Sequence, residues 1–294
     1  MLNLGEVITA MVTPFDKNFK LDSESSRKLM KYLIDEGCDG ILLAGSTGES
    51  STLEDNEKLE LFKLAKDNFG GKVKIIAGTG SNDTKHSIEL SKEAEKIGVD
   101  CLLLVTPYYN KPSQWGIYKH FEAIAREVSI PIILYNVPSR TSSNISSKTC
   151  LELSKIDNIC GIKEASGNLR QISEIIRDTD DDFLVYSGND GETLPVLSIG
   201  GYGVISVASH IVCREIKEMI SSFKKGDFNK ASEIHRRLLD IFYGIFIVTN
   251  PVPIKEALNL KGVAVGPCRL PLCSMEEKEL SAFKDILKKH KIID

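Results

Sequence analysis

Residues 101–136 read CLLLVTPYYNKPSQWGIYKHFEAIAREVSIPIILYN and contain one complete strand–helix–strand unit. Two short apolar runs, 101–106 and 132–136, flank an amphipathic stretch at 113–128. Each run is almost continuously apolar, which is typical of parallel strands that are covered on both faces. Parallel neighbours need a long crossover between them, and the amphipathic stretch supplies it as a helix. The segment therefore predicts a βαβ unit.

The same unit recurs along the chain. Eight apolar runs follow one another about 28 residues apart, at 7–13, 40–44, 74–78, 101–106, 132–136, 159–164, 183–187 and 203–207. Helical stretches lie between or after them, at 25–37, 56–69, 83–97, 113–128, 146–154, 169–177, 192–199 and 212–225. Eight units at regular spacing favour a closed (β/α)8 barrel of the TIM type over an open doubly wound sheet. No GxGxxG follows the first run, which argues against dinucleotide binding.

The last part of the chain has a different pattern. Three further stretches read as helical, at 227–248, 254–260 and 275–290, and no strand-like run separates them. We therefore expect two domains: a (β/α)8 barrel catalytic domain at 1–225 and a C-terminal helical domain at 226–294.

Composition excludes several classes of protein. The 294 residues are 42% hydrophobic and 27% charged, with 37 basic and 41 acidic side chains and a net charge of −4. No basic block stands out, so nucleic acid is not an expected partner. All apolar runs are shorter than the ~20 residues that a membrane helix needs. The first residues, MLNLGEVITAMVTPF, lack a basic region and do not resemble a signal peptide, so we expect a cytoplasmic protein.

Cysteine and histidine usage predicts neither disulfides nor a metal site. The seven cysteines are odd in number, scattered and without a CxxC pair, which is typical of reduced thiols. The five histidines fall in different units, and no HExxH occurs. We expect no metal and no organic cofactor.

Lys163 is the most informative residue of the predicted barrel. Barrel enzymes carry their chemistry at the C-terminal ends of the strands, where Lys163 lies within ICGIKE at 159–164. Alternation along a strand places Gly161, Lys163 and Ala165 on one face, which is the barrel interior if Ile162 packs toward the helices. A desolvated lysine has a lowered pKa and can form a Schiff base with a carbonyl substrate. A structural lysine paired with a buried carboxylate explains the position equally well.

Three other strand ends carry candidate groups. Tyr135 lies one strand earlier at a comparable height and can relay protons near an imine, or be a core tyrosine. The loop Gly45-Ser46-Thr47-Gly48 can present N–H groups and hydroxyls to a carboxylate, or be a plain turn. Arg140 can bind a carboxylate with two hydrogen bonds, or form a surface ion pair.

Five motifs in order resemble one known family. GSTGES at 45–50, VTPYYNKP at 105–112, YNVPSRT at 135–141, GIKEASG at 161–167 and NPVPIKEAL at 250–258 are similar to motifs of the dihydrodipicolinate synthase family. Its members, also called 4-hydroxy-tetrahydrodipicolinate synthases, belong to the pyruvate-dependent lyases together with N-acetylneuraminate lyase. The resemblance runs from the first strand into the C-terminal helices.

The resemblance implies a role for each matching residue. Lys163 matches the lysine that forms a Schiff base with pyruvate, and Tyr135 matches the tyrosine that moves protons near the imine. Thr47 matches the threonine that links Tyr135 to a second tyrosine, Tyr109, which reaches into the site of a neighbouring subunit. The remaining matches concern binding: Ser46 and Thr47 hold the pyruvate carboxylate, Arg140 receives the carboxylate of L-aspartate-4-semialdehyde, and the backbone of Gly188 and Ile205 lines the pocket.

The resemblance also implies a reaction and an assembly. The expected activity condenses pyruvate with L-aspartate-4-semialdehyde to 4-hydroxy-tetrahydrodipicolinate, in diaminopimelate and lysine biosynthesis, within a homotetramer built from two dimers. One alternative is another Schiff-base aldolase of the same family, either N-acetylneuraminate lyase or a 2-keto-3-deoxy sugar acid aldolase. A second alternative is a catalytically silent barrel with a binding role, against which the intact lysine, tyrosines and threonine argue.

One departure from the family concerns regulation. In relatives that lysine inhibits, an allosteric pocket lies near the positions of Ser50, Ser51, Lys58, Asn82, His86 and Tyr108. Inhibited members often have histidine at the position of Lys58 and an acidic residue at that of His86. The positive charge of Lys58 would repel the ammonium groups of free lysine, so we expect weak feedback or none.

Overall fold

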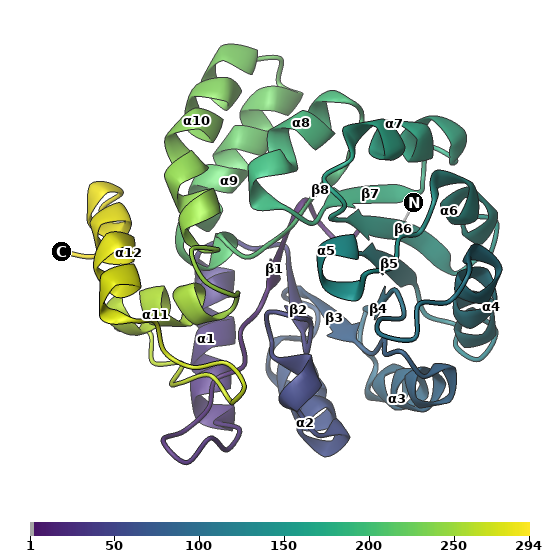
Figure 1. The fold of residues 1–294 in the computed structure, drawn as a ribbon, viewed down its shortest axis with the longest axis horizontal. Helices are drawn as coiled ribbons and strands as arrows, with labels where there is room; N and C mark the ends of the chain where they lie inside the picture. Colours follow the sequence, from purple (N-terminus) through teal and green to yellow (C-terminus); the bar gives the residue numbers. More distant parts are fainter. Residues whose placement is uncertain (1–2) are drawn as a thin grey trace.

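Eight parallel strands form a closed barrel in the computed structural model, which describes residues 3–294 (Figure 1). The strands are β1 (Val7–Ala10), β2 (Gly40–Leu43), β3 (Lys74–Gly78), β4 (Cys101–Val105), β5 (Ile132–Asn136), β6 (Ile159–Glu164), β7 (Leu184–Ser187) and β8 (Gly203–Ser206). Each strand pairs in parallel with the next, and β8 pairs with β1. The predicted barrel and all eight of its strands are confirmed.

Helices surround the barrel. Those of the barrel units are α1 (Ser23–Asp35), α2 (Asp55–Phe69), α3 (Thr84–Ile97), α4 (Gln114–Ala125), α6 (Ser147–Leu153), α7 (Leu169–Asp178), α8 (Thr193–Ser198) and α9 (Ser209–Lys224). Short helical turns, η1 (Ser50–Thr52), α5 (Pro138–Thr141) and η2 (Asp190–Glu192), follow β2, β5 and β7. These turns were not predicted, because three or four residues carry no measurable periodicity. They shape the loops at the C-terminal ends of the strands.

The core has two parts, which correspond to the two faces of the strands. An outer cluster between strands and helices includes Ile162, whereas an inner cluster inside the barrel includes Ile133, Tyr135 and Ala165. Ile162 therefore packs toward the helices, and the alternate residues of β6 face inward. This confirms the predicted orientation of the strand that carries Lys163.

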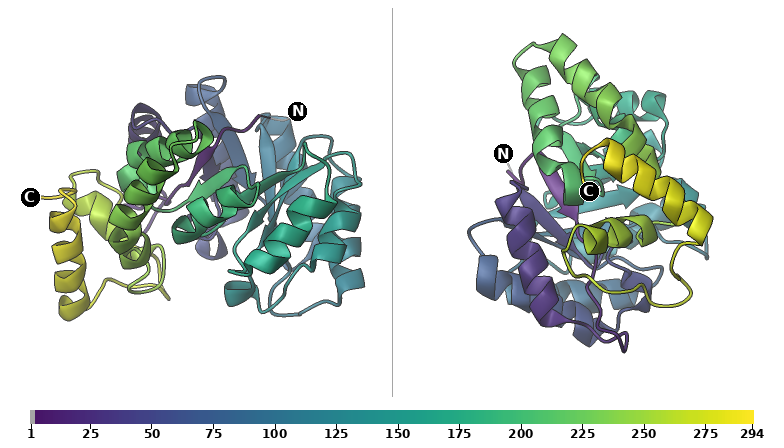
Figure 2. Two further views of the ribbon diagram at one scale, coloured as in Figure 1. Left: turned by 90° about the horizontal axis from the view of Figure 1, so that it is seen from above. Right: turned by 90° about the vertical axis from the view of Figure 1, so that its left-hand side faces the viewer.

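Three helices follow the barrel: α10 (Phe228–Gly244), α11 (Val252–Leu260) and α12 (Glu277–Lys289). Helix α10 packs against α9 and also contacts α12. Figures 1 and 2 show α11 and α12 on the side of α1 and α10, away from α4 and α6. The division that we propose after residue 225 falls between α9 and α10.

Two further features bear on the expectations from composition. All seven cysteines are free: Cys38, Cys101, Cys150 and Cys213 are buried, and Cys273 is exposed. Within residues 3–294, no helix has both the length and the apolar character needed to cross a bilayer.

Candidate active site

Lys163 and Tyr135 face each other across neighbouring strands. They are direct partners in the register of β5 and β6, so their side chains leave the sheet at the same height. The Lys163 Nζ atom lies 4.3 Å from the centroid of the Tyr135 ring. Both side chains are buried, with 5% and 6% of their surface exposed. The pairing follows from the parallel register, which places the fourth residue of β5, Tyr135, beside the fifth residue of β6, Lys163.

Burial changes the acidity of the Lys163 amine. Loss of solvation lowers the pKa of Lys163 to about 8; the carboxylate of Asp190 opposes this shift and the charge of Arg140 adds to it. Burial also raises the pKa of Tyr135, against the smaller effects of Arg140 and the Ser46 hydroxyl. The uncharged, nucleophilic form of the amine is therefore far more accessible near neutral pH than in a solvated lysine, while the phenol keeps its proton.

A cavity of about 380 Å³ surrounds the amine. Six of the predicted site residues line it: Ser46, Thr47, Tyr135, Arg140, Lys163 and Gly188. They come from the loops or ends of β2, β5, β6 and β7, which meet at the same end of the barrel. Phe242, Tyr243 and Phe246, from α10 and the residues just after it, complete the lining on the side of the C-terminal helices.

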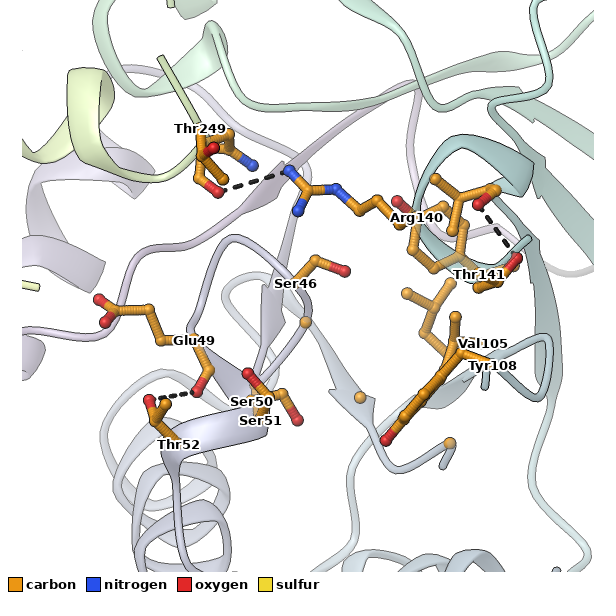
Figure 3. Close-up of a pocket in the computed structure, with 18 of the residues that line it drawn as sticks. Ser46, Glu49, Ser50, Ser51, Thr52, Val105, Tyr108, Arg140, Thr141 and Thr249 are labelled. Carbon is orange, nitrogen blue, oxygen red and sulfur yellow. Dashed lines mark hydrogen bonds between the residues drawn. The ribbon is translucent and has the colours of Figure 1, made fainter. Parts of the chain in front are cut away.

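A second cavity of about 330 Å³ adjoins the first (Figure 3). Both cavities are lined by Ser46, Tyr135, Val137, Arg140 and Asn250. Figure 3 shows Arg140 extending across this space toward the segment at Thr249, with Ser46 and Tyr108 both below it in this view. The two volumes are sufficient for two small substrates side by side.

Arg140 is held by backbone rather than by a carboxylate. It lies on the short helix α5, which begins at Pro138, and its Nη2 donates to the carbonyl of Asn250 at 3.4 Å. A carbonyl leaves the charge of the guanidinium uncompensated. Arg140 therefore keeps the capacity to bind an anionic group of a ligand.

Gly188 packs tightly against the Lys163 side chain. A Cβ atom at Gly188 would lie 2.7 Å from the Ala165 Cβ and 3.2 Å from the Lys163 Cε. The Gly188 N–H donates to the Glu164 carbonyl at 2.7 Å. Only glycine lets the backbone after β7 approach the lysine this closely.

Two predicted site residues lie outside this cavity. Tyr109 is 88% exposed, with a positive φ of 70° in the loop after β4. Ile205 is buried in the apolar cluster inside the barrel. The structure therefore does not bring Tyr109 to Lys163 within one chain.

The predicted regulatory residues fall into two groups. Ser50, Ser51 and Tyr108 line the second cavity. Lys58 and His86 both contact Asp55: Lys58 Nζ lies 3.0 Å from Oδ1, and His86 Nε2 lies 2.7 Å from Oδ2. Nearby, the carbonyl of Asn82 accepts a hydrogen bond from Asn110. The sequence pattern did not point to Asp55, which supplies a carboxylate between Lys58 and His86.

Sequence reasoning missed several buried groups around the site. The side chain of Asn250 donates to Thr47 Oγ1 at 2.9 Å, and Lys255 forms a buried ion pair with Glu49. The motifs GSTGES and NPVPIKEAL contained these residues, but single-sequence patterns do not show which loops meet. Asp190 follows Gly188 and accepts hydrogen bonds from Ser206, Val207 and Ala208. Among residues 3–294, no group of three or more His, Cys, Asp or Glu side chains is placed to hold a metal ion.

The fold and this site together define a (β/α)8-barrel lyase with a buried lysine amine at the C-terminal ends of its strands. Comparison with known proteins gives the same class. Residues 3–290 match the model of the dihydrodipicolinate synthetase family. The chain belongs to this family.

Individual relatives are similar over their full length. The chain is 48% identical over 292 residues to 4-hydroxy-tetrahydrodipicolinate synthase of Desulforudis audaxviator, covering 99% of both chains. Dihydrodipicolinate synthase DapA-2 of Bacillus anthracis is 46% identical, with a TM-score of 0.96 over 98% of this chain and 99% of that one. The enzyme of Cyanidioschyzon merolae, solved with lysine bound, is 44% identical, with a TM-score of 0.97 over 99% of both chains.

Proposed function

We propose that this protein condenses pyruvate with L-aspartate-4-semialdehyde to 4-hydroxy-tetrahydrodipicolinate, a step of diaminopimelate and lysine biosynthesis. The observation that carries the proposal is the buried Lys163 amine, 4.3 Å from the Tyr135 ring centroid and in a cavity that Arg140 also lines. The names of the relatives support the same reaction.

In the first half of the proposed reaction, the uncharged Lys163 amine attacks the ketone of pyruvate. Water leaves from the resulting carbinolamine, and an imine forms. Ser46 and Thr47 hold the pyruvate carboxylate, while Tyr135 and Thr47 transfer the protons that addition and dehydration require. The relay ends at Tyr109 of a second subunit.

In the second half, the imine loses a methyl proton and becomes an enamine. The enamine carbon attacks the aldehyde of the second substrate, whose carboxylate Arg140 receives. The substrate amine then attacks the imine carbon, closes the ring and releases Lys163. The backbone of Gly188 and Ile205 borders the pocket. Each step transfers only protons and carbon or nitrogen electron pairs, so the proposed chemistry needs no cofactor.

We also propose the assembly and location that the resemblance implied. The exposed Tyr109 side chain supports a dimer in which each chain completes the other's relay. Two such dimers would form a tetramer, and the protein would act in the cytoplasm.

The decisive experiment offers the purified protein both substrates and, separately, pyruvate with sodium borohydride. We expect product formation and a reduced pyruvate adduct at Lys163, absent from Lys163→Ala. An adduct with cleavage of sialic acid or a 2-keto-3-deoxy sugar acid, and no reaction with aspartate semialdehyde, would identify another aldolase. If no adduct forms, the protein is not a Schiff-base lyase, and the alternative of a barrel with a binding role is supported.

Regulation is a second proposal. We propose that free lysine inhibits this enzyme weakly or not at all, because Lys58 places a buried cation at the candidate pocket and its neighbour Asp55 is already paired with Lys58 and His86. The measurement is initial rate against lysine concentration, with Lys58→His/His86→Glu as the comparison. Strong inhibition of the unmodified enzyme at sub-millimolar lysine would contradict the proposal.

A further inference from the structure

The proposed reaction creates a positive charge inside the barrel. When the Lys163 amine condenses with the ketone of pyruvate and water leaves, the reactive form of the adduct is the protonated imine, whose charge lies on Nζ. Only 5% of the Lys163 surface is exposed. A buried cation is costly unless an opposite charge lies nearby. The site therefore needs a carboxylate close to this nitrogen.

Asp190 and Glu192 of η2 both line the cavity around the amine, but they differ in burial. Asp190 is 2% exposed. Glu192 is only half-buried, and its Oε2 accepts a hydrogen bond from Asn189 Nδ2 at 2.9 Å. Charges interact more strongly where water is excluded. Asp190 is therefore the carboxylate with the stronger hold on a cation at Lys163.

The end of β8 and the residues after it hold the Asp190 carboxylate. Ser206 Oγ donates to Oδ1, and the N–H groups of Val207 and Ala208 donate to Oδ2 at 3.1 and 3.2 Å. Ser206 Oγ in turn accepts from the N–H of Ser209 at 2.8 Å. Backbone N–H groups can only donate, so they favour the ionised carboxylate and oppose the rise in its pKa that burial causes. The carboxylate is thus fixed in place and kept charged.

The strand register brings η2 to the height of the amine. Lys163 of β6 pairs with Tyr186 of β7, and β7 ends one residue later. The next residue, Gly188, donates its N–H to the Glu164 carbonyl at 2.7 Å, which keeps the backbone close to the lysine side chain. Helical turn η2 begins two residues further on, at Asp190. The carboxylate and the amine therefore face the same cavity from neighbouring strands.

We propose that Asp190 is a positioning residue that acts through the Lys163 nitrogen: its carboxylate is the counter-ion of the protonated imine. The inference rests on the proposed function, but only on its Schiff base with pyruvate and not on the second substrate. No bond to Asp190 forms or breaks, and the carboxylate acts by its charge alone.

Other titratable groups near the amine do not supply this negative charge. Burial raises the pKa of Tyr135 on β5 and of Tyr186 on β7, so both phenols stay neutral at neutral pH. Arg140 is a cation, and its charge lowers the pKa of the amine. The side chain of Glu164 leaves β6 on the opposite face, because residues alternate along a strand. Asp190 is the group whose charge raises the pKa of the amine against the effect of burial.

The test follows the protonated imine in the variant Asp190→Asn. Asparagine has nearly the same shape and no charge; its amide oxygen can accept from both N–H groups, and its NH2 can donate to Ser206 Oγ. Sodium cyanoborohydride reduces the protonated imine. At a low concentration of this reagent and subsaturating pyruvate, the trapping rate follows the population of that species. This population declines as the pH rises through the pKa of the free amine, because the imine then has to take up a proton from solvent.

We expect the decline to be centred near pH 8 in the unmodified protein. Without the Asp190 charge the amine holds its proton less tightly, so the decline is centred at a lower pH. The trapping rate of Asp190→Asn relative to the unmodified protein should therefore fall by about tenfold from about pH 6 to about pH 9, which corresponds to a pKa change of about one unit. At the acidic end the amine and the imine both carry the charge, so their balance there depends little on Asp190.

Two variants from the same cavity serve as controls. Glu192→Gln removes the less buried carboxylate, and the centre of the decline should stay near that of the unmodified protein. Arg140→Gln removes a positive charge, so the centre should move to higher pH. Shifts of opposite sign from charges of opposite sign are the signature of electrostatics, which a general loosening of the cavity does not produce.

A loss in Asp190→Asn by the same factor at every pH would show that Asp190 only packs, and an unchanged profile would show that another group balances the charge. Either result overturns the inference. If Asp190→Asn does not fold, Ser206→Ala replaces it: this variant loosens and partly neutralises the carboxylate, so a smaller shift of the same sign is expected. If the unmodified protein forms no adduct with pyruvate, the proposed function fails and the inference with it. If the adduct forms but aspartate semialdehyde does not react, only the proposed second substrate fails, and the pH profile still decides the role of Asp190.

Discussion

The chemistry of Lys163 depends on an environment that opposes its charge. The amine lies at the C-terminal end of β6, and its pKa falls from the usual 10.5 to about 8 through burial. The carboxylate of Asp190 opposes this shift, although its own pKa is raised by burial. Such an environment favours the neutral nucleophile and destabilises the protonated form, so function and stability are opposed at this residue.

We predict that Lys163→Met stabilises the protein at neutral pH. Below pH 8 the folded and unfolded chains both carry the proton, so the full desolvation penalty is present, on the order of 3 kcal/mol for a shift of this size. Between about 8 and 10.5 only the unfolded chain keeps its proton, and stability rises with pH. Guanidinium unfolding should therefore show a gain for Lys163→Met at pH 7 that shrinks at pH 10. The exposed Lys17→Met serves as control; an equal gain there would contradict the prediction.

A glycine pair on the loop after β7 offers a matched comparison. Alanine at Gly188 would press on Ala165 and on the Lys163 Cε atom, whereas the nearest atom to a Cβ at Gly191 is the Tyr243 hydroxyl at an ordinary 3.6 Å. Both glycines line the same cavity. We expect Gly188→Ala to slow pyruvate adduct formation by about tenfold or more, since small displacements of a reacting group are costly. Gly191→Ala should stay near the unmodified rate, and equal losses would refute the steric argument.

At the scale of elements, the C-terminal helices hold the catalytic loop in place. The loop after β2 has a turn with Glu49 at a positive φ of 56°, which costs conformational energy for a side-chain-bearing residue. The Lys255 ammonium of α11, 2.6 Å from Glu49 Oε1, and the Arg269 N–H, which donates to Oε2, offset this cost. The C-terminal part of the chain thus stabilises a loop of the barrel.

We predict that removing either charge of this ion pair alone lowers the free energy of unfolding. Lys255→Met leaves the Glu49 carboxylate buried, and Glu49→Gln leaves the Lys255 ammonium buried; each should cost about 3–5 kcal/mol. The double variant removes both charges, so it should recover much of the loss. Denaturant unfolding of the four proteins completes a double-mutant cycle. Additive losses would show that the two charges do not depend on each other.

Within a single chain, one member of the proposed proton relay is missing from the site. Tyr109 is 88% exposed, and Tyr108 and Trp115 add further exposed aromatic surface along the same stretch of chain. Large exposed aromatics of this kind are typical of interfaces. We propose that a second copy of the chain covers this surface and completes the site.

Complementation between two inactive variants tests whether Tyr109 acts in the neighbouring subunit. Lys163→Ala lacks the nucleophile and Tyr109→Phe lacks the relay hydroxyl, so each should lose most activity alone. If the two are unfolded and refolded together, a mixed dimer contains one site with both an intact Lys163 and an intact Tyr109 from its partner. We expect activity well above that of either parent. Activity that never exceeds the parents would place Tyr109 within its own subunit's site or outside the relay.

The sequence by itself determined the barrel, because eight apolar runs at regular spacing carry a strong period and parallel strands demand crossovers. It also grouped Gly161, Lys163 and Ala165 on one face of a strand, because side chains alternate along a strand, but the structure was needed to show that this face is the barrel interior. The short turns α5, η1 and η2 were beyond its reach, being too brief for any period.

Only the tertiary structure decided which loops meet. Asn250 and Lys255 lie some 200 residues from Thr47 and Glu49 in the chain, and no local pattern joins them. The pKa of Lys163 likewise depends on solvent exclusion by several strands and loops together. The succession of strands and the alternation of side chains between two faces follow from the local sequence pattern. Contacts between distant loops, and the desolvation that these contacts produce, arise only when the barrel closes.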